Sequence, residues 1–370
     1  MTAPDVTILG GGIAGLATAI ACAGQGRSVE VIEQASALTE VGAGLQIAPN
    51  GLRVLQALGV SVPGIDSKAV QVIDGPTGRH LIRMPLGSGF RLVHRADLIA
   101  SLADRSGDVG LRLGTRVASV SDDARMLALN DGTRIPVNML IGADGARGAS
   151  RGFVAPDHKA RFTGQVAWRA IVPVRDWPAE AQIHVGPGRH MVLYPLRDAT
   201  MLNIVAVEER TQWVADGWSH RDDPQALRDA FAGYAAPVRA LLDRVETVHI
   251  WGLMDHGMTP EWTRGACTLI GDAAHPTLPF LAQGANLALE DAWSISRHLD
   301  APGAFVAARR PRVARALAAA AGNARNYHLT GLRRLGAHGA LRLLDRIAPG
   351  LMTRKYDWLY DYDVTATQTP

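Results

Sequence analysis

Hydrophobic residues near the start of the chain fall into two short runs, separated by a glycine turn and an alanine-rich run. Residues 5–9 and 28–32 are apolar and rich in β-branched side chains, whereas residues 16–25 are rich in alanine. Short β-branched runs predict buried parallel strands, and alanine favours a helix. A strand, a helix and a second strand form a βαβ unit, which requires a right-handed crossover and a parallel sheet.

The middle of the chain follows a different pattern, in which strand-like segments alternate with turns. This pattern covers residues 69–92 and 162–251, and turn sequences such as Gly186-Pro187-Gly188 interrupt it. Within and between these blocks we expect strands at 139–142, 165–172, 190–196 and 202–208, and a helix at 95–105. The pattern then predicts a strand at 267–270, a loop at 271–283, a helix at 284–299 and a helical end from about residue 311.

These patterns predict an α/β (α+β) protein with a Rossmann-like nucleotide-binding domain and an inserted β-sheet substrate domain. We expect residues 1–70, 95–160 and 265–325 to form the discontinuous nucleotide-binding domain. Residues 71–94 and 161–264 are expected to form the β-rich substrate domain, and residues 326–370 a C-terminal helical segment and tail.

Composition and charge argue against a nucleic-acid or membrane-spanning protein. The 370 residues are 47% hydrophobic and 20% charged, and the formal net charge is only +3. Basic residues are scattered, apart from a cluster of Arg309, Arg310, Arg312 and Arg315 that we interpret as a solvated helix face. No stretch is long and apolar enough to predict a membrane span. Two distant cysteines without metal-ligand spacing and a start without a basic signal region predict a cytoplasmic protein.

The first motif with chemical meaning is Gly10-x-Gly12-x-x-Gly15, followed by Glu33 at the end of the second strand. Glycines allow a tight turn, and the helix that follows presents unpaired N–H groups to a pyrophosphate. Glu33 is placed to accept hydrogen bonds from ribose hydroxyls, and its charge disfavours a 2′-phosphate. The motif therefore predicts a dinucleotide, either FAD or NAD.

Two later turns favour FAD over NAD as the dinucleotide. Each follows a predicted strand, one at Asp144-Gly145 and the other at Gly271-Asp272, so that a carboxylate stands at a strand end. Ligands of open α/β sheets bind at such strand ends, although an aspartate there is often only a turn former. The order of all three motifs, more than any one of them, favours FAD.

The sequence resembles the class A flavoprotein monooxygenases, the FAD-dependent aromatic hydroxylases. Beyond the motifs above, the resemblance rests on residues 41–44, 49–51, 94–98, 142–145, 271–276, 283–286 and 290–292 and covers nearly the whole chain. It implies that Arg95 contacts FAD, that Asp144 lies in a turn touching cofactor and NAD(P)H, and that Asp272 holds the ribityl chain. The predicted cofactor contacts are Gly10, Gly12, Ile13, Ala14, Gly15, Glu33, Gln34, Gly44, Arg95, Val117, Asp144, Gly145, Gly271, Asp272, Gly284, Ala285 and Asn286.

The resemblance also implies a reaction. NAD(P)H reduces the flavin, oxygen forms a C4a-hydroperoxide, and its distal oxygen attacks an electron-rich ring carbon. The glycine-rich start of the helix at residue 284 would face the anionic edge of reduced flavin. This chemistry requires no metal, so we expect none, and we interpret His275 as structural.

Three residues are candidates for contact with the substrate: His190 and Tyr194, four residues apart on one predicted strand, and Gln283 before the helix. A base near the operating pH would deprotonate a phenol. The alternative is that His190 is an exposed edge residue and Tyr194 a core aromatic. Arg169 is a candidate partner for a substrate carboxylate, or else part of a surface ion pair. Trp168, Leu193, Trp251 and Met254 are candidates for an aromatic-binding wall, or else ordinary core.

The expected substrate is a small phenolic or carboxylated aromatic ring, together with O2. A terminal Trp358-Leu359-Tyr360 segment resembles salicylate and 3-hydroxybenzoate hydroxylases, and it is expected to pack on the body or at a subunit contact. The alternatives are a heteroaromatic such as a hydroxynicotinate, a quinone-type substrate, or a flavin-binding module without catalysis. A lipid-like substrate would predict an apolar patch near residues 332–351. Either a monomer or a homodimer is compatible with the sequence.

Overall fold

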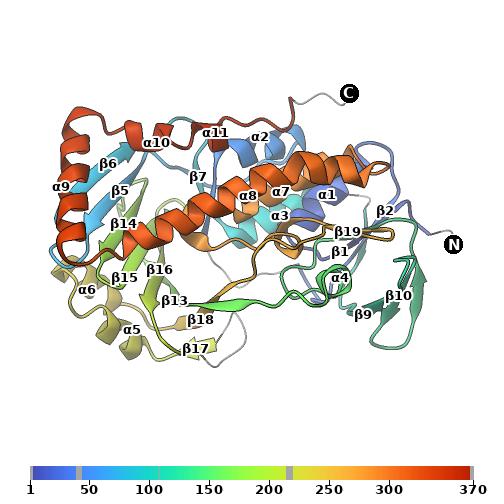
Figure 1. Cartoon of the computed structure of the whole chain (residues 1–370), viewed down its shortest axis with the longest axis horizontal. Coiled ribbons are helices and arrows are strands. Elements are labelled where there is room, and N and C mark those ends of the chain that lie inside the picture. The colour runs from blue at the N-terminus through green and yellow to red at the C-terminus, as the bar shows by residue number, and fades with distance from the viewer. Residues whose placement is uncertain (1–2, 39–43, 108, 214–219, 367–370) are drawn as a thin grey trace.

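The computed structural model describes residues 3–38, 44–107, 109–213 and 220–366. Two large sheets lie side by side, and the long helix α8 (Pro302–Tyr327) runs across both (Figure 1). Residues 41–43 of the family-like motif lie outside the described residues. No helix in the described ranges is long and apolar enough to cross a lipid bilayer.

The predicted βαβ unit is present in the first sheet, whose strand order is β19-β20-β12-β1-β2-β8. All neighbours are parallel except the β19–β20 pair. Helix α1 (Ile13–Ala23) connects β1 to β2. The strands are β1 (Val6–Leu9), β2 (Val29–Ile32), β8 (Gly110–Arg112), β12 (Leu140–Gly142), β19 (Thr263–Arg264) and β20 (Cys267–Leu269).

The second sheet has the order β17-β18-β13-β16-β15-β14-β5-β6 and is antiparallel except between β5 and β14. Its strands are β5 (Ala69–Asp74), β6 (His80–Pro85), β13 (Arg161–Pro173), β14 (Glu180–Gly186), β15 (Arg189–Leu196), β16 (Met201–Glu209), β17 (His220–Asp222) and β18 (Val248–Asp255). Two three-stranded sheets complete the strands: β3 (Gly44–Ile47) with β7 (Arg91–His94) and β4 (Ile65–Asp66), and β9 (Val117–Val120) with β10 (Met126–Leu129) and β11 (Arg134–Pro136).

Helices α2, α3 and α7 pack near the first sheet, and the last helices follow α8 toward the C-terminus (Figure 1). Their bounds, with those of α4, are α2 (Pro49–Ala57), α3 (Arg95–Ser106), α4 (Ala149–Val154), α7 (Gly284–Ser296), α9 (Gly331–Ile347), α10 (Leu351–Arg354) and α11 (Asp357–Tyr360). Two short 3-10 helices, Gly271–Ala273 and Pro279–Leu281, lie in the segment predicted as a loop.

The prediction of strands throughout residues 162–251 is wrong at α5 (Pro224–Ala230) and α6 (Ala236–Leu242). Asp223 caps α5 by accepting a hydrogen bond from the Gln225 N–H, and proline stands in the first turn of both helices. The expected start of the helical end at residue 311 is also wrong, because α8 begins at Pro302 and contains Pro311. The helix-initiating proline is therefore Pro302.

The second sheet has two different faces. Trp168, Met191 and Leu193 point to one face, where they pack in a core that includes Phe231 of the α5–α6 segment. Alternate residues of the same strands point to the other face, which meets β3 and the loop around Phe280. Trp168 and Leu193 are thus core residues on the face that packs against Phe231, whereas Trp251 lies on the opposite face with Phe280. The three residues therefore cannot form one substrate-binding wall.

Candidate active site

A cavity of about 860 Å³ opens at the carboxyl ends of β1 and β2. Eight of the predicted cofactor contacts line it: Gly10, Gly12, Glu33, Gln34, Arg95, Val117, Asp144 and Gly145. Leu38, Thr115, Arg116 and Asn130 line it as well and were not predicted, because they belong to no glycine or strand-end motif. Arg147, two residues after the Asp144-Gly145 turn, also lines it and was not among the predicted contacts. The cavity lies where open α/β sheets bind ligands.

The glycine turn is shaped by contacts that exclude side chains. Gly10 has φ +103°, and a β-carbon there would lie 2.4 Å from the Ala143 carbonyl oxygen. A β-carbon on Gly15 would lie 1.9 Å from the carbonyl oxygen of Gly10. Helix α1 begins at Ile13, with Ala14 in its first turn, and no side chain caps it. Its first N–H groups are therefore available to a ligand at the turn. This cradle fits a pyrophosphate.

Glu33 lies at the end of β2, beside the glycine turn. Its carboxylate accepts hydrogen bonds from the Gly11 N–H at 2.6 Å and the Ala35 N–H at 2.8 Å. The side chain is partly exposed and lines the cavity. A carboxylate held in this way faces the region that ribose hydroxyls would occupy next to the glycine turn.

Asp144 is held by the turn that contains it. Its carboxylate accepts hydrogen bonds from the N–H of Ser150, at 3.0 Å, and from the Ser150 hydroxyl. Burial raises the pKa of Asp144, and these hydrogen bonds oppose that rise. A β-carbon on Gly148 would lie 2.0 Å from the carboxyl carbon, so the turn is closed around it. The carboxylate thus fixes the start of α4 as well as lining the cavity.

The Gly271-Asp272 turn approaches the glycine turn from the other side. Gly271 has φ +53°, and a β-carbon there would lie 3.1 Å from the Ala14 side chain and 3.3 Å from that of Ala288. Asp272, the next residue, is exposed to solvent. The structure therefore brings the start of α1, the Gly271 turn and α7 together.

The start of α7 carries Gly284, Ala285 and Asn286. Helix α7 has no side-chain cap, and a β-carbon on Gly284 would lie 2.7 Å from the Thr277 hydroxyl. Asn286 accepts a hydrogen bond from the Ala48 N–H at 2.9 Å and donates to the carbonyls of Gln46 and Ala282. Its side chain therefore binds the backbone between β3 and α2.

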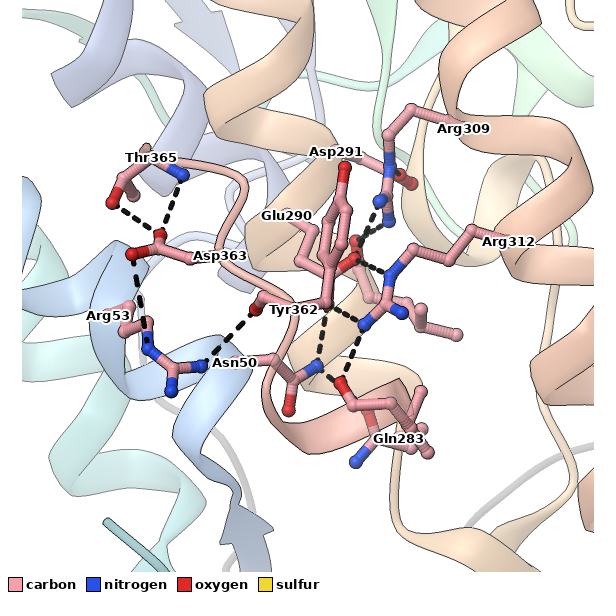
Figure 2. A network of polar contacts seen from close by, with 12 residues as sticks. Asn50, Arg53, Gln283, Glu290, Asp291, Arg309, Arg312, Tyr362, Asp363 and Thr365 are labelled. Carbon is pink, nitrogen blue, oxygen red and sulfur yellow. Dashed lines mark hydrogen bonds and ion pairs between the residues drawn. The ribbon is translucent and has the colours of Figure 1, made fainter. Parts of the chain in front are cut away.

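A buried network of charges joins α7 to α8, and Figure 2 shows Glu290 and Asp291 of α7 beside Arg309 and Arg312 of α8. Asp291 accepts hydrogen bonds from the Gly271 N–H at 3.0 Å and from Arg309 at 2.8 Å, and it lies 2.5 Å from His275 Nε2. Glu290 pairs with Arg309 at 2.6 Å and with Arg312 at 2.7 Å. The contact of its Nε2 atom with Asp291 supports the interpretation of His275 as structural.

The interpretation of the arginine cluster as a solvated helix face is wrong for two of its members. Arg309 is fully buried, and the Arg312 side chain is only 9% exposed. Two adjacent buried carboxylates, Glu290 and Asp291, are stable only when cations pair with them, and these two arginines of α8 form those pairs. Through Glu290 the network reaches Asn50, which donates to Glu290 at 2.6 Å and to Gln283 at 3.0 Å.

Of the three candidate substrate residues, His190 and Tyr194 share a face of β15, and Gln283 lies at the start of α7. β15 is flanked by β14 and β16, so the alternative of an exposed edge histidine is wrong, and His190 is 2% exposed. Tyr194 is buried against Gly44, while Gln283 is buried on Asn50. Among the described residues, none of the three forms a hydrogen bond with another; Tyr194 lies against Gly44, and Gln283 joins the α7 network through Asn50.

Comparison with known proteins identifies the family. The family described as FAD binding domain matches residues 92–303, and an NAD(P)-binding Rossmann-like domain matches residues 8–45. The chain is 33% identical to 3-hydroxybenzoate 6-hydroxylase from Polaromonas naphthalenivorans (strain CJ2), over 97% of this chain and 96% of that protein. It is 34% identical to 3-amino-4-hydroxybenzoate 2-monooxygenase from Streptomyces cremeus, over 88% of each.

Among solved structures, a salicylate hydroxylase substrate complex shares the fold, with a TM-score of 0.81 at 24% identity over 97% of this chain and 95% of that one. The glycine cradle, in which β-carbons at Gly10 and Gly15 would collide with backbone, fits the pyrophosphate of the cofactor that the family binds. The chain belongs to the class A flavoprotein monooxygenases, the FAD-dependent aromatic hydroxylases, which use NAD(P)H as co-substrate.

Proposed function

We propose that this enzyme hydroxylates a small benzoate that already carries a hydroxyl group, such as 3-hydroxybenzoate or salicylate. The names of both curated relatives support a hydroxybenzoate substrate. Bound FAD supplies hydride acceptance from NAD(P)H and activation of O2. The chain must therefore bind the cofactor, orient the ring, exclude water and move the phenolic proton.

The observation that carries the proposal is the position of Arg169 on β13. Arg169 lies on the same sheet face as Tyr194 and Asn203, and its guanidinium carbon is 4.7 Å from the centre of the Trp251 ring. Burial raises the pKa of Tyr194, and the charge of Arg169 opposes that rise, as expected for neighbours. A half-buried arginine beside aromatic side chains suits a ring that bears a carboxylate. Arg169 is proposed to bind that carboxylate.

His190 is proposed as the base that takes the phenolic proton, because removing this proton makes the ring more electron-rich. Burial lowers the pKa of His190 well below its ordinary value, and the neighbouring His328 lowers it further. A histidine in this environment is neutral near pH 7 and keeps a lone pair for the proton, although the same shift makes it a weaker base than a free histidine. Tyr194 is proposed to contact the ring from the same sheet face, and Gln283 to line the approach from α7.

The cofactor contacts remain a proposal for each residue. The glycine turn, Ile13, Ala14 and Glu33 would hold the ADP half of FAD, with Gln34, Arg95, Val117 and the Asp144-Gly145 turn along the 860 Å³ cavity. Gly44, the Gly271-Asp272 turn and the start of α7 would surround the flavin half. On this proposal the first sheet belongs to the FAD-binding part and the second sheet to the substrate part, with the boundaries predicted above.

The test is substrate-stimulated NAD(P)H consumption with matched ligands. 3-Hydroxybenzoate or salicylate should accelerate it and yield a product one oxygen heavier, with loss of CO2 if hydroxylation is decarboxylative. Phenol, which lacks the carboxylate, should be poor. Arg169→Met should lower kcat/KM for the benzoate roughly 10-fold to 100-fold, the range for a lost charged hydrogen bond. Arg161→Met is the matched control on the same strand, because the Arg161 side chain is 84% exposed.

One observation supports a second candidate for the substrate. Leu332, Leu335, Leu343, Ile347 and Leu351 are exposed, by 54% to 86%, within or beside α9. A lipid-like substrate would predict an apolar patch at this place, and a quinone precursor with an apolar tail is a substrate of that kind. A quinone precursor that accelerates NAD(P)H consumption more than any benzoate would favour this candidate, whereas a preference for benzoates would oppose it.

We propose a cytoplasmic location, where NAD(P)H is available. Cys22 and Cys267 are both free and buried, as in proteins of a reducing compartment. The enzyme is proposed to act as a monomer or homodimer, and light scattering on the purified holoenzyme would distinguish these states. Secretion of the chain from its host, detected by fractionation, would contradict the location.

A further inference from the structure

His190 is the inner end of a chain of three polar side chains that leads to the surface. His190 Nδ1 lies 2.7 Å from Nε2 of His328, and His328 Nδ1 lies 2.8 Å from a carboxylate oxygen of Glu209. The two histidines are 2% and 7% exposed, whereas the Glu209 side chain is 56% exposed. The three residues come from β15, from the residue after α8 and from the end of β16.

Glu209, at the exposed end, determines the direction of both hydrogen bonds that link these three residues. The carboxylate oxygens of Glu209 accept hydrogen bonds, so His328 donates to them from Nδ1. Nε2 of His328 is then without hydrogen and must accept, so His190 donates from its own Nδ1. His190 Nε2 therefore carries a lone pair, which is the form required of a base.

The surrounding groups support this order. Gln165 Nε2 also approaches His328 Nδ1, but at 3.4 Å, so the shorter contact with the charged Glu209 prevails. Burial lowers the pKa of His328, Glu209 raises it and Arg189 lowers it. Tyr327 packs on the His190 ring with centres 5.0 Å apart, and burial raises the pKa of its phenol, so it stays neutral. The Phe280 ring also lies near His190, with ring centres 5.7 Å apart.

We propose that Glu209 and His328 are positioning residues that act through His190, holding its Nε2 free of hydrogen and carrying the substrate proton to solvent. This inference rests on the proposed role of His190 as the base. When the phenolic O–H bond breaks, its proton binds His190 Nε2. The proton on His190 Nδ1 passes to His328 Nε2, and the proton on His328 Nδ1 passes to Glu209, which releases it to water. No electrons are transferred, and one proton leaves for each proton taken up. Both rings then carry hydrogen on Nε2, and they return to the Nδ1–H form when a water proton enters at Glu209 and the Nε2 proton of His190 leaves into the emptied substrate site.

The first test reads the tautomers without any turnover. In the ¹⁵N-histidine-labelled holoenzyme, the imidazole signals of His190 and His328, assigned by single His→Gln variants, should both show hydrogen on Nδ1. Free imidazole side chains favour hydrogen on Nε2, so the expected signals are distinctive. In Glu209→Gln the Nδ1–H form of both rings should be lost in part. Hydrogen on Nε2 of His190 in the unmodified enzyme would overturn the proposal, even if the enzyme proved to use another substrate.

The second test is kinetic and uses the hydroxybenzoate that the enzyme prefers. Glu209→Gln and His328→Ala should each lower kcat roughly 10-fold or more, as when a partner that orients a functional histidine is removed. The acidic limb of the kcat–pH profile should also shift, because the charge of Glu209 no longer favours proton uptake. Added imidazole should restore part of the activity of His328→Ala. Glu246→Gln, an exposed glutamate outside the chain of contacts, is the control and should match the unmodified enzyme.

The outcomes separate the relay from the base. If His190→Ala keeps full turnover, both the proposed base and its relay are overturned. If His190→Ala loses turnover while Glu209→Gln and His328→Ala keep their rates and pH profiles, the relay alone is overturned. Reduced stability of His328→Ala without imidazole rescue, together with an unshifted pH profile in Glu209→Gln, would show a merely structural role and would also overturn it.

Discussion

The backbone of Gly44 lies against the ring of Tyr194 so closely that a β-carbon on Gly44 would be 2.4 Å from a carbon of that ring. The Gly44 N–H also donates to the side chain of Asn203 at 3.0 Å, and Asn203 is the cross-strand neighbour of Tyr194. A residue predicted to contact FAD is thus in direct contact with a residue predicted to contact substrate. Any side chain at Gly44 must move one of them.

Gly44→Ala is expected to separate β3 from Tyr194. A β-carbon at 2.4 Å from a ring carbon cannot be accommodated without a shift, and overpacking of this kind typically costs about 1–3 kcal/mol. We expect weaker FAD retention and slower substrate-stimulated NAD(P)H consumption, because both proposed halves of the site border this contact. Flavin fluorescence after ultrafiltration and steady-state kinetics measure the two effects. Gly87→Ala is the control, since nothing lies within 4 Å of its added β-carbon; equal behaviour of the two variants would refute the prediction.

Asp272→Ala is expected to weaken flavin binding with little loss of protein stability. The side chain is exposed beside the Gly271 turn, and the buried Arg151, whose charge Asp272 favours, keeps its hydrogen bonds to the carbonyls of Ala273 and His256. If Asp272 holds the ribityl hydroxyls of FAD, losing a charged hydrogen bond should raise the Kd for FAD roughly 10-fold to 100-fold. Titration of the apoprotein with FAD measures this. Asp104→Ala, on the exposed surface of α3, is the control, and an unchanged Kd in Asp272→Ala would exclude the assigned role.

Local patterns predicted the parts of the fold that depend on neighbours in sequence. The βαβ unit, the strands near His190 and the helix after Gln283 follow from periodicity and glycine placement, and each is present. Helices α5 and α6 were missed because they are only seven residues long, although Asp223-Pro224 is a good helix start. Because the two helices are so short, the turn-forming residues around them hid the helix-start sequence Asp223-Pro224.

The contacts that no local pattern predicted join distant segments. Arg309 and Glu290 are nineteen positions apart on two consecutive helices, α8 and α7, and nothing in the sequence around Arg309 distinguishes it from an exposed arginine. The signal that could have found it lies elsewhere, in the adjacent acids Glu290 and Asp291 on an otherwise apolar helix. Similarly, His328 pairs with His190 across 138 positions, beyond the reach of periodicity.

Arg309→Met is expected to destabilise the protein strongly. It would leave Glu290 and Asp291 buried with one cation fewer, and breaking a buried ion pair costs about 3–5 kcal/mol. Unfolding of the holoenzyme in urea, followed by tryptophan fluorescence, should show a lower midpoint. Arg310→Met removes the same charge from the next residue of α8, which is half-buried, and should change the midpoint far less. Similar losses in both variants would argue against a special role for the Glu290–Asp291 network.

The same network predicts a pH dependence. Although burial raises the pKa of Asp291, the charges of His275 and Arg309 lower it to about 2, below its ordinary value of 3.8. A lowered pKa gives stability that is fully present above the ordinary value and is lost as pH falls toward 2. The stability difference between the unmodified enzyme and Arg309→Met should therefore be largest at pH 5–7 and shrink below about pH 4. Urea midpoints at several pH values test this, and a difference that grows on acidification would contradict it.

The last prediction concerns the C-terminal tail, which packs on the charge network. Arg312 donates to the carbonyls of Trp358 and Leu359 at 3.1 and 2.8 Å, and its guanidinium carbon lies 3.9 Å from the centre of the Tyr362 ring. Arg53 of α2 donates to the Tyr360 carbonyl at 2.8 Å and lies beside Asp363 (Figure 2). The tail thus covers Arg312, which binds Glu290, which in turn binds Asn50 next to Gln283.

Ending the chain after Lys355 should expose Arg312 to water and weaken its hold on Glu290, because exposed ion pairs contribute only about 0–1 kcal/mol. We expect a lower melting temperature and, through Asn50 and Gln283, a several-fold weaker affinity for FAD. Ending the chain after Ala366 retains all of these contacts and is the control. Arg312→Gln tests the same link in the full-length chain, so that a truncation that fails to fold does not decide the question. If Arg312→Gln melts earlier but binds FAD as tightly as the unmodified enzyme, the tail contributes to stability and not to the cofactor site.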